Sequence, residues 1–211
     1  MKRLLSALAL MSAVGAGAVH ADKADRQIIA LSEACDPDIT EINRLPMHTD
    51  HFAFRAGEPF DKKLSANYLS LDGKWRFLYT PSRILRPDPA KVMSKDCDDS
   101  TWDSIAVPGV WELNGYGAPL YLNSGYPWSG RFESIPPNVP DDENAVGSYR
   151  RWVYIPAEWK GRDITAHFGS VTSNMSLWVN GQRVGYGEDS KLAQEFDLTP
   201  YIIPGRDNLI A

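Results

Sequence analysis

The chain is poor in the residues that build metal centres and disulfide scaffolds. It has two cysteines and four histidines among 211 residues, and it contains neither a CxxC pair nor an HExxH spacing. A GxSxG turn and a phosphate-binding glycine loop are also missing, which excludes the common serine-nucleophile and nucleotide-binding motifs. His48 and His51 lie three residues apart, but Pro46 disfavours a helix there, so we expect a solvated loop rather than metal ligands.

Positive charge is also scarce. The chain has 22 Lys and Arg residues against 27 Asp and Glu residues, a formal net charge of −5. No basic patch is available to neutralise a phosphate backbone, so nucleic acid is not an expected partner. Hydrophobic residues make up 43% of the chain and aromatic residues 11%, which is enough to bury a core and excludes a disordered protein.

Long hydrophobic runs are confined to the first residues. Lys2 and Arg3 precede an apolar stretch from Leu4 to Val19, and the tripeptide Val19-His20-Ala21 follows with small residues. This layout is typical of a secretory signal peptide, so we expect residues 1–21 to be removed and the mature chain to be periplasmic or secreted, without membrane contact. A membrane anchor is the alternative, but the stretch is shorter than the roughly 20 residues that a spanning helix needs.

The two cysteines, Cys35 and Cys97, both follow the expected cleavage site. Disulfides can persist in an exported protein, so the two residues could be joined by one bridge. Two separate thiols are the alternative, because a free cysteine often behaves as a small buried hydrophobe. The sequence leaves both alternatives open.

Short alternating segments dominate the chain after residue 66. The 15 prolines and 16 glycines interrupt the chain too often for long helices. The pair Asn180-Gly181 stands between two alternating runs and is a strong hairpin signal, because both turn residues tolerate positive φ. We expect strands within residues 75–79, 105–107, 149–155, 164–168, 177–179 and 184–186, with Trp75, Trp102, Trp152 and Trp178 in the core. Short strands separated by turns predict an all-β sandwich.

Two stretches depart from the strand pattern. Residues 22–66 are interpreted as a polar N-terminal arm with one short helix around residues 26–34. Residues 108–147 are rich in glycine and proline but also in aromatic residues, which indicates an ordered excursion with a function. Tyr121, Tyr126 and Trp128 either stack on a sugar or anchor this excursion to its domain.

The last four residues, Asn208–Ala211, look like a strand that stops without a turn. A sandwich that lacks a strand exposes an edge, which natural proteins normally avoid. We therefore expect residues 67–211 to form a C-terminally incomplete domain of a longer protein. We also expect an unprotected edge at residues 208–211.

Five compact polar and aromatic strings follow one another in a distinctive order. They are Asn43–His48 (NRLPMH), Val107–Glu112 (VPGVWE), Pro119–Asn123 (PLYLN), Tyr186–Lys191 (YGEDSK) and Glu195–Leu198 (EFDL). In this order and spacing they resemble the N-terminal domain of the β-galactosidases of glycoside hydrolase family 2. The resemblance implies an all-β, jelly-roll (galactose-binding-like) β-sandwich, and a full-length protein that hydrolyses terminal non-reducing β-D-galactosides with retention. The chain departs from many relatives at Asn144–Gly147, which alters a turn and leaves the implied sugar contacts unchanged.

The resemblance assigns substrate-binding roles to two residues. Asn123 matches an asparagine that hydrogen-bonds the galactosyl hydroxyls, and Asp189 matches an aspartate that contacts the sugar and ligates sodium. An amide can donate to and accept from a sugar diol, whereas a carboxylate accepts from hydroxyls and binds a hard cation. The alternative is that both side chains only stabilise turns, since Asn and Asp readily bond their own backbone.

The resemblance also implies what this chain leaves to other domains. The two catalytic glutamates and the magnesium ligands of the family belong to a TIM barrel, so no catalytic residue is expected in this chain and its sodium site is only partial. The expected partners are a β-galactoside and the missing C-terminal domains of the same protein. Whether the full-length protein forms a homo-oligomer is left open.

Two other functions fit parts of the sequence. A free-standing, non-catalytic carbohydrate-binding module would share the sandwich, but it should finish its last strand. A β-glucuronidase or β-mannosidase would share the same domain, although the strings that contain Asn123 and Asp189 favour galactose.

Overall fold

The computed structural model describes residues 33–119, 139–141 and 143–211. The chain divides into two units, Met1–Thr40 with Ser134–Val139, and Glu41–Glu133 with Pro140–Ala211. In the first unit the described residues include a 3₁₀ helix, η1, at Glu33–Cys35. The expected signal peptide and nearly all of the helix expected around residues 26–34 lie outside the described residues. Within the described ranges, no helix combines the length and the apolar character that crossing a bilayer requires.

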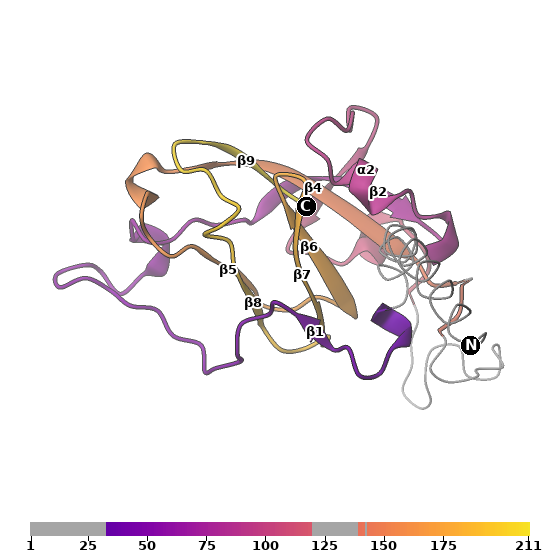
Figure 1. The fold of residues 1–211 in the computed structure, drawn as a ribbon, viewed down its shortest axis with the longest axis horizontal. Helices are drawn as coiled ribbons and strands as arrows, with labels where there is room; N and C mark the ends of the chain where they lie inside the picture. Colours follow the sequence, from indigo (N-terminus) through magenta and orange to yellow (C-terminus); the bar gives the residue numbers. More distant parts are fainter. Residues whose placement is uncertain (1–32, 120–138, 142) are drawn as a thin grey trace, which may run out of the picture. The chain divides into compact units, whose positions relative to one another are not determined.

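The second unit is an all-β sandwich of antiparallel strands, as the sequence predicts (Figure 1). Its strands are β1 (Glu41–Ile42), β2 (Gly73–Thr80), β3 (Asp103–Val107), β4 (Val146–Ile155), β5 (Thr165–Phe168), β6 (Asn174–Val179), β7 (Gln182–Glu188), β8 (Gln194–Asp197) and β9 (Arg206–Ile210). One sheet has the order β1-β7-β6-β9-β4-β2-β3, and β5 pairs with β8 in the other. The helical elements are short: η2 (Lys62–Leu64), η3 (Arg83–Leu85), α2 (Pro89–Val92), η4 (Trp111–Asn114) and η5 (Ala157–Trp159).

Both sheets contribute to a single hydrophobic core. Phe77 of β2 and Leu177 of β6 are 1% and 2% exposed, and Phe196 of β8 is fully buried. These residues belong to one cluster together with Ile155, Ile164, Val179, Val184 and Ile210, among others. Burying each large apolar side chain contributes about 1.5–3 kcal/mol, so this cluster is the main stabilising element of the sandwich.

The hairpin of β6 and β7 forms where the sequence predicts it. Asn180 and Gly181 have φ values of 52° and 81°, which are the positive values that a tight hairpin turn requires. A register shift between Leu177 and Trp178 bends β6 just before the turn. The side-chain amide of Asn180 donates to the backbone carbonyl of Tyr201 at 2.8 Å, which ties the hairpin to the chain before β9.

The segment that follows β1 joins the two sheets. Glu41 and Ile42 pair with Gly187 and Tyr186 of β7, whereas Arg44 forms an isolated bridge with Phe196 of β8. The amide of Leu45 donates to the carbonyl of Glu195 at 2.8 Å. Residues 41–45 therefore leave the larger sheet at its β7 edge and continue along β8.

Strand β4 buries different faces along its length. Val153 and Ile155 point into the core, whereas Trp152 and Tyr154 are 48% and 56% exposed. The prediction that Trp152 belongs to the core is therefore wrong, because strand alternation turns it to the opposite face. Trp75 is buried as predicted, and Trp102 and Trp178 are only partly buried.

The face of β4 that carries Trp152 is covered near the start of the strand. Arg150 lies there and is only 1% exposed. Its Nε donates to Oδ2 of Asp99 at 2.8 Å, and its guanidinium also donates to the backbone carbonyls of Val92, Ser94 and Cys97. One buried arginine thus pairs with three backbone carbonyls at the end of α2 and in the turn that follows it.

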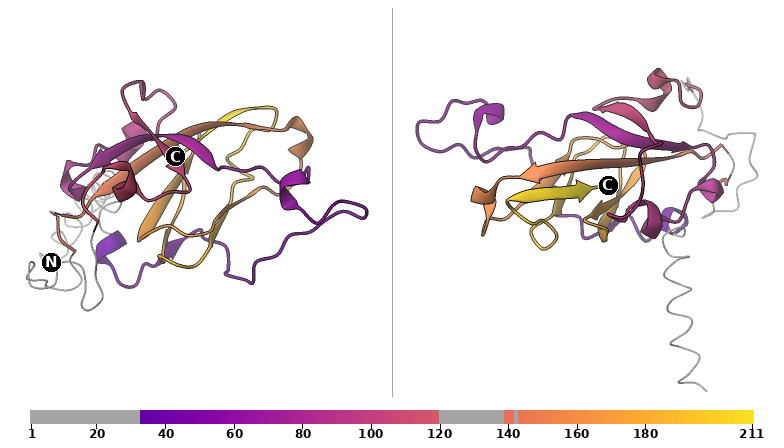
Figure 2. Two further views of the ribbon diagram at one scale, coloured as in Figure 1. Left: turned by 180° about the vertical axis from the view of Figure 1, so that it is seen from behind. Right: turned by 90° about the horizontal axis from the view of Figure 1, so that it is seen from above.

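Strand β9 lies in the interior of the sheet. It pairs with β4 from Arg151↔Ile210 to Ile155↔Arg206, and Ile210 also pairs with Val179 of β6. Figure 2 shows β4 passing between β2 and β9. The unprotected edge expected at residues 208–211 is therefore wrong, because the hairpin of β6 and β7 covers the far side of β9.

Two further expectations concern the excursion and the cysteines. At the start of the excursion, Trp111 and Tyr116 pack against the core, and the hydroxyl of Tyr116 donates to Asp103 at 2.8 Å. Tyr121, Tyr126 and Trp128 lie outside the described residues.

Cys97 is half-buried and carries a free thiol, so the structure does not show the disulfide alternative.

Candidate functional site

Two site residues were predicted from the sequence, and Asp189 is the one that lies within the described residues. It follows directly on β7. Its Oδ1 accepts hydrogen bonds from the amides of Lys191 at 2.9 Å and Leu192 at 3.2 Å. Its own amide donates to the carbonyl of Ser173 at 3.2 Å. These bonds hold the backbone amide and one carboxylate oxygen of Asp189.

The backbone of Asp189 has an unusual conformation. Its φ is 134°, a value far outside the left-handed helical region that Asn and Asp otherwise tolerate. Such a conformation costs on the order of 1–3 kcal/mol and persists only where the surroundings enforce it. An aspartate that serves only to stabilise a turn has no need of this strain. The strain therefore favours a role beyond the turn.

The carboxylate of Asp189 is held in its charged form. Hydrogen bonds from the amides of Lys191 and Leu192 lower its pKa below the ordinary value, and the positive charge of Arg44 acts in the same direction. Within the described part of the chain, no donor contacts the second oxygen, Oδ2. Asp189 can therefore accept a hydrogen bond from a hydroxyl or supply one hard oxygen ligand to a cation such as sodium.

Polar side chains of β7 itself and of neighbouring segments surround the end of β7. The hydroxyl of Tyr186 donates to Oε1 of Glu188 at 2.6 Å, and Arg44 forms an ion pair with Glu41. Gln194, the first residue of β8, is fully buried and donates from Nε2 to the backbone carbonyl of Asp189 at 3.3 Å. Gln194 could not be recognised from the sequence, because a single glutamine at the start of a short strand carries no recognisable signal.

The second predicted site residue, Asn123, lies outside the described residues. The structure therefore does not place Asn123 relative to Asp189. In the described ranges, no group of three or more His, Cys, Asp or Glu side chains is arranged to hold a metal ion. A hollow of about 250 Å³ between Trp159, Ile164 and Ile202 lies elsewhere in the sandwich and does not include Asp189.

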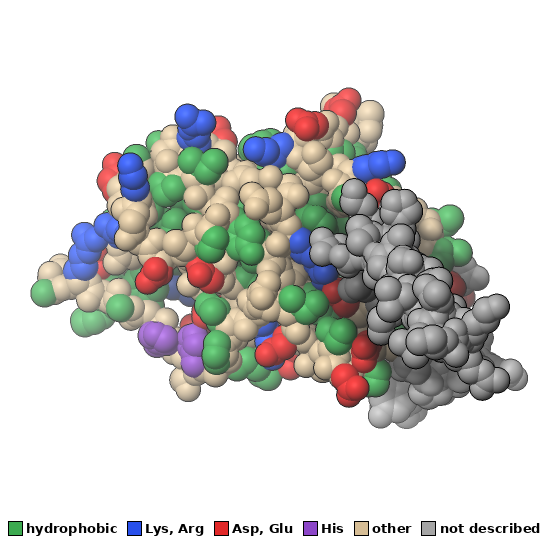
Figure 3. All heavy atoms as spheres, viewed as in Figure 1, with side chains coloured by type: hydrophobic (Ala, Val, Ile, Leu, Met, Phe, Trp, Pro, Cys, Tyr) green, Lys and Arg blue, Asp and Glu red, His purple; other side chains and the backbone are tan. Residues whose placement is uncertain are grey.

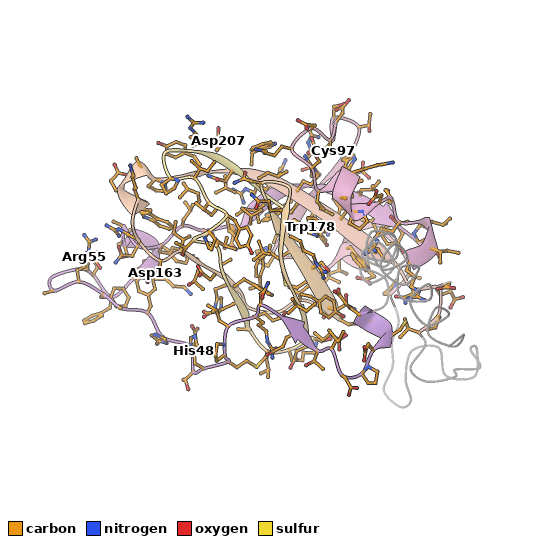
Figure 4. The ribbon with its side chains drawn as sticks, viewed as in Figure 1. His48, Arg55, Cys97, Asp163, Trp178 and Asp207 are labelled. Carbon is orange, nitrogen blue, oxygen red and sulfur yellow. The ribbon has the colours of Figure 1, made fainter. Side chains whose placement is uncertain are left out.

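A second polar cluster, which the sequence did not reveal, links three elements. Oε2 of Glu195 lies 2.8 Å from Nε2 of His48, and Oε1 lies 2.9 Å from Nδ1 of His167. His48 belongs to the irregular segment after β1, as Figure 4 shows, and Figure 3 shows histidine side chains gathered in one place on the face in view. His48 and His51 are both exposed and lie outside any helix, as the sequence predicts.

Fold and site together define an all-β sandwich domain whose candidate site is a charged group at a strand end. Residues 68–211 match the family model of the glycosyl hydrolases family 2, sugar binding domain. The chain therefore belongs to glycosyl hydrolase family 2.

The similar curated proteins are much longer than this chain. The chain is 39% identical to a β-galactosidase of Halalkalibacterium halodurans, with 82% of this chain and 17% of that protein covered. It is 37% identical to the β-galactosidase large subunit of Lactobacillus helveticus, with 83% and 30% covered. Among solved structures, a glycosyl hydrolase family 2 member from Bacteroides cellulosilyticus is similar with 28% identity and a TM-score of 0.45, with 67% and 16% covered.

Proposed function

We propose that this chain is the sugar-binding part of a retaining β-galactosidase, which hydrolyses terminal non-reducing β-D-galactosides. The observation that carries this proposal is the match of the sugar-binding family model to residues 68–211, the part of the chain that contains most of the sandwich. Relatives at 39% and 37% identity are named β-galactosidases, which favours galactose over glucuronic acid or mannose as the sugar.

Asp189 is proposed to contact the galactosyl group. Its fixed backbone, its charged carboxylate and the uncontacted Oδ2 support this role. Hydrogen bonds to sugar hydroxyls contribute most to catalysis when they strengthen as the oxocarbenium-like state forms. Asn123 is proposed as a second sugar contact, on the resemblance of its sequence string to the family.

Sodium is the cation proposed for the same carboxylate. The donor chemistry fits, because a carboxylate oxygen with no hydrogen-bond donor is a suitable ligand for a hard cation. Asp189 would hold the ion from this chain, and the remaining ligands would come from other parts of the full-length protein. Magnesium, in contrast, is proposed to bind to other domains of the full-length protein, without a ligand from this chain.

Hydrolysis itself is proposed to require residues of other domains. A retaining glycosidase needs a general acid and a nucleophile, usually two carboxyl groups about 5 Å apart. The family resemblance assigns both glutamates to a barrel beyond the sandwich. The 211-residue chain alone should therefore not hydrolyse galactosides.

The test compares the full-length protein with the 211-residue chain on chromogenic β-galactoside, β-glucuronide and β-mannoside substrates. We expect the full-length protein to hydrolyse the galactoside and the short chain to hydrolyse none of them. Hydrolysis of the glucuronide or mannoside in preference to the galactoside would overturn the choice of sugar. Sugar binding without hydrolysis by the full-length protein would instead favour the carbohydrate-binding module.

Export is proposed as well, with cleavage after Ala21. The support is the arrangement of Lys2, Arg3 and the apolar stretch before Ala21. N-terminal sequencing of protein recovered from the periplasm or the medium should begin at Asp22. Recovery of protein that retains Met1 in the membrane fraction would contradict the proposal.

A further inference from the structure

The buried side-chain amide of Gln194 contacts the backbone carbonyl of Asp189 from outside the turn that holds the carboxylate. Gln194 is fully buried, and its Nε2 donates to the carbonyl of Asp189 at 3.3 Å. Its Oε1 has no hydrogen-bond partner within the described residues. A buried, unsatisfied acceptor is costly, and an apolar side chain of the same shape would avoid that cost. An apolar side chain could not supply the hydrogen bond to Asp189.

Gly187 explains how the amide of Gln194 reaches this place. A Cβ atom added at Gly187 would overlap the side-chain oxygen of Gln194 and lie only 2.9 Å from its Cδ, whereas Cδ of Arg44 lies at an ordinary 3.6 Å. The missing side chain at position 187 therefore makes room for the glutamine. The two residues form a matched pair: Gly187 precedes Asp189 by two positions, and Gln194 follows it by five.

The remaining contacts of Asp189 hold its carboxylate and its backbone amide, but not its carbonyl. The amides of Lys191 and Leu192 hold the carboxylate, and the carbonyl of Ser173 accepts from the backbone amide. Of these groups, none contacts the carbonyl of Asp189. If the carbonyl of Asp189 had no partner, the backbone on that side could rotate. The strained φ of 134° could then relax, and the carboxylate would move with the backbone.

We infer that Gln194 is a positioning residue for Asp189, and that Gly187 is glycine so that the glutamine can fit. This inference deepens the proposed function, on which its kinetic part rests. Gln194 does not touch the sugar in this account. It acts by fixing the peptide of Asp189, so that the carboxylate meets the galactosyl group in one orientation.

The competing explanation is that Gln194 only fills space between β7 and β8. A pair of substitutions separates the two roles. Gly187→Ala alone should collide with Gln194, and Gln194→Ala alone should leave a gap. The double variant Gly187→Ala/Gln194→Val replaces most of the lost side-chain volume with apolar atoms, so packing is largely kept while the hydrogen bond to Asp189 stays lost. Gln182→Ala, at an exposed position of β7, serves as the control.

The first readout is the exchange of amide protons with water, measured by NMR on the 211-residue chain. The amides of Lys191 and Leu192 report directly on the position of Oδ1 of Asp189. In the double variant we expect these two amides to exchange about three- to tenfold faster, the effect of losing one ordinary hydrogen bond, while the amides of β9 keep their wild-type rates. The control should match the wild type throughout.

The second readout is steady-state kinetics of the full-length protein with a β-galactoside. The double variant should lose about three- to tenfold in kcat/KM at an unchanged melting temperature, in line with the loss of one hydrogen bond. Wild-type exchange at Lys191 and Leu192 in the double variant would overturn the inference and leave Gln194 as a packing residue. If Asp189→Ala itself leaves hydrolysis unchanged, the proposed sugar contact fails, and the exchange measurement still decides whether Gln194 positions Asp189.

Discussion

Nε2 of His48 lies 2.8 Å from Oε2 of Glu195, although the two residues are 147 positions apart in the chain. Nδ1 of the same ring lies 2.8 Å from the carbonyl of Thr49. A neutral imidazole can donate only once, whereas the imidazolium donates from both nitrogens. The geometry therefore favours the charged form of His48. In that form, His48 attaches the segment that follows β1 to strand β8.

This attachment should depend on pH. The carbonyl of Thr49 and then Glu195 raise the pKa of His48 above its ordinary 6.5, so its stabilising effect is complete below 6.5 and is lost as the pH rises through the raised pKa. Burial opposes ionisation of Glu195, but hydrogen bonds from His167 and His48 outweigh it and lower the pKa below 4.5. The effect of Glu195 is lost as the pH falls through that lowered pKa. The stabilising contributions of His48 and Glu195 are both fully present between pH 4.5 and pH 6.5.

An NMR titration of the His48 ring tests this account. In Glu195→Gln the pKa of His48 should fall toward 6.5 without reaching it, because the carbonyl of Thr49 remains. Glu158→Gln, at an exposed position of η5, is the matched control and should leave the titration unchanged. An identical pKa of His48 in Glu195→Gln and wild type would contradict the contact.

Arg150 should be one of the most sensitive polar positions in the sandwich. It is 1% exposed and donates to Asp99 and to three backbone carbonyls. Arg150→Met keeps much of the volume but leaves these acceptors unpaired, so the free energy of unfolding should fall by about 3–5 kcal/mol. Urea denaturation measures this change. Arg206→Met, at an exposed position of β9, should change stability by less than about 0.5 kcal/mol, and an equal effect of both variants would refute the role of Arg150.

The stability of the sandwich should also decrease at alkaline pH. Burial, and then the negative charge of Glu112, raise the pKa of Tyr149 from 10.0 to about 12. A raised pKa means that the stabilising effect of the neutral ring is complete below 10.0 and is lost as the pH rises toward 12. Tyr149→Phe should therefore lose less stability over this range than the wild type in thermal melts. Tyr154→Phe, on the exposed face of β4, should behave as the wild type; if Tyr149→Phe does so too, the assignment is wrong.

The sequence predicts the parts of the fold that depend on local chemistry. The Asn180-Gly181 turn was recognisable because its backbone needs residues that tolerate positive φ, and the structure confirms it. Trp152 was misplaced because alternation shows which residues share a face but not which face is covered. The edge expected at residues 208–211 was wrong for a similar reason: strand order depends on pairings between distant residues, such as Val179 with Ile210.

The candidate site is predictable to a smaller extent. The string around Asp189 indicated the residue, but its strained φ and its contact with Gln194 depend on β7 and β8 lying side by side. The cluster of His48, His167 and Glu195 was invisible for the same reason, since its members come from three separate segments. The proposed role of Asn123 stays a prediction from its sequence string.

The most direct test of the central claim is the kinetics of Asp189→Ala in the full-length protein, with a β-galactoside and over a sodium titration. Loss of a charged hydrogen-bond partner of the sugar should lower kcat/KM by roughly tenfold to hundredfold and weaken the response to sodium. The melting temperature should stay close to that of Asp207→Ala, a control on β9 that Figure 4 labels. Wild-type kinetics and sodium response, or a loss of activity that only follows a lowered melting temperature, would contradict the assignment of Asp189 to the sugar.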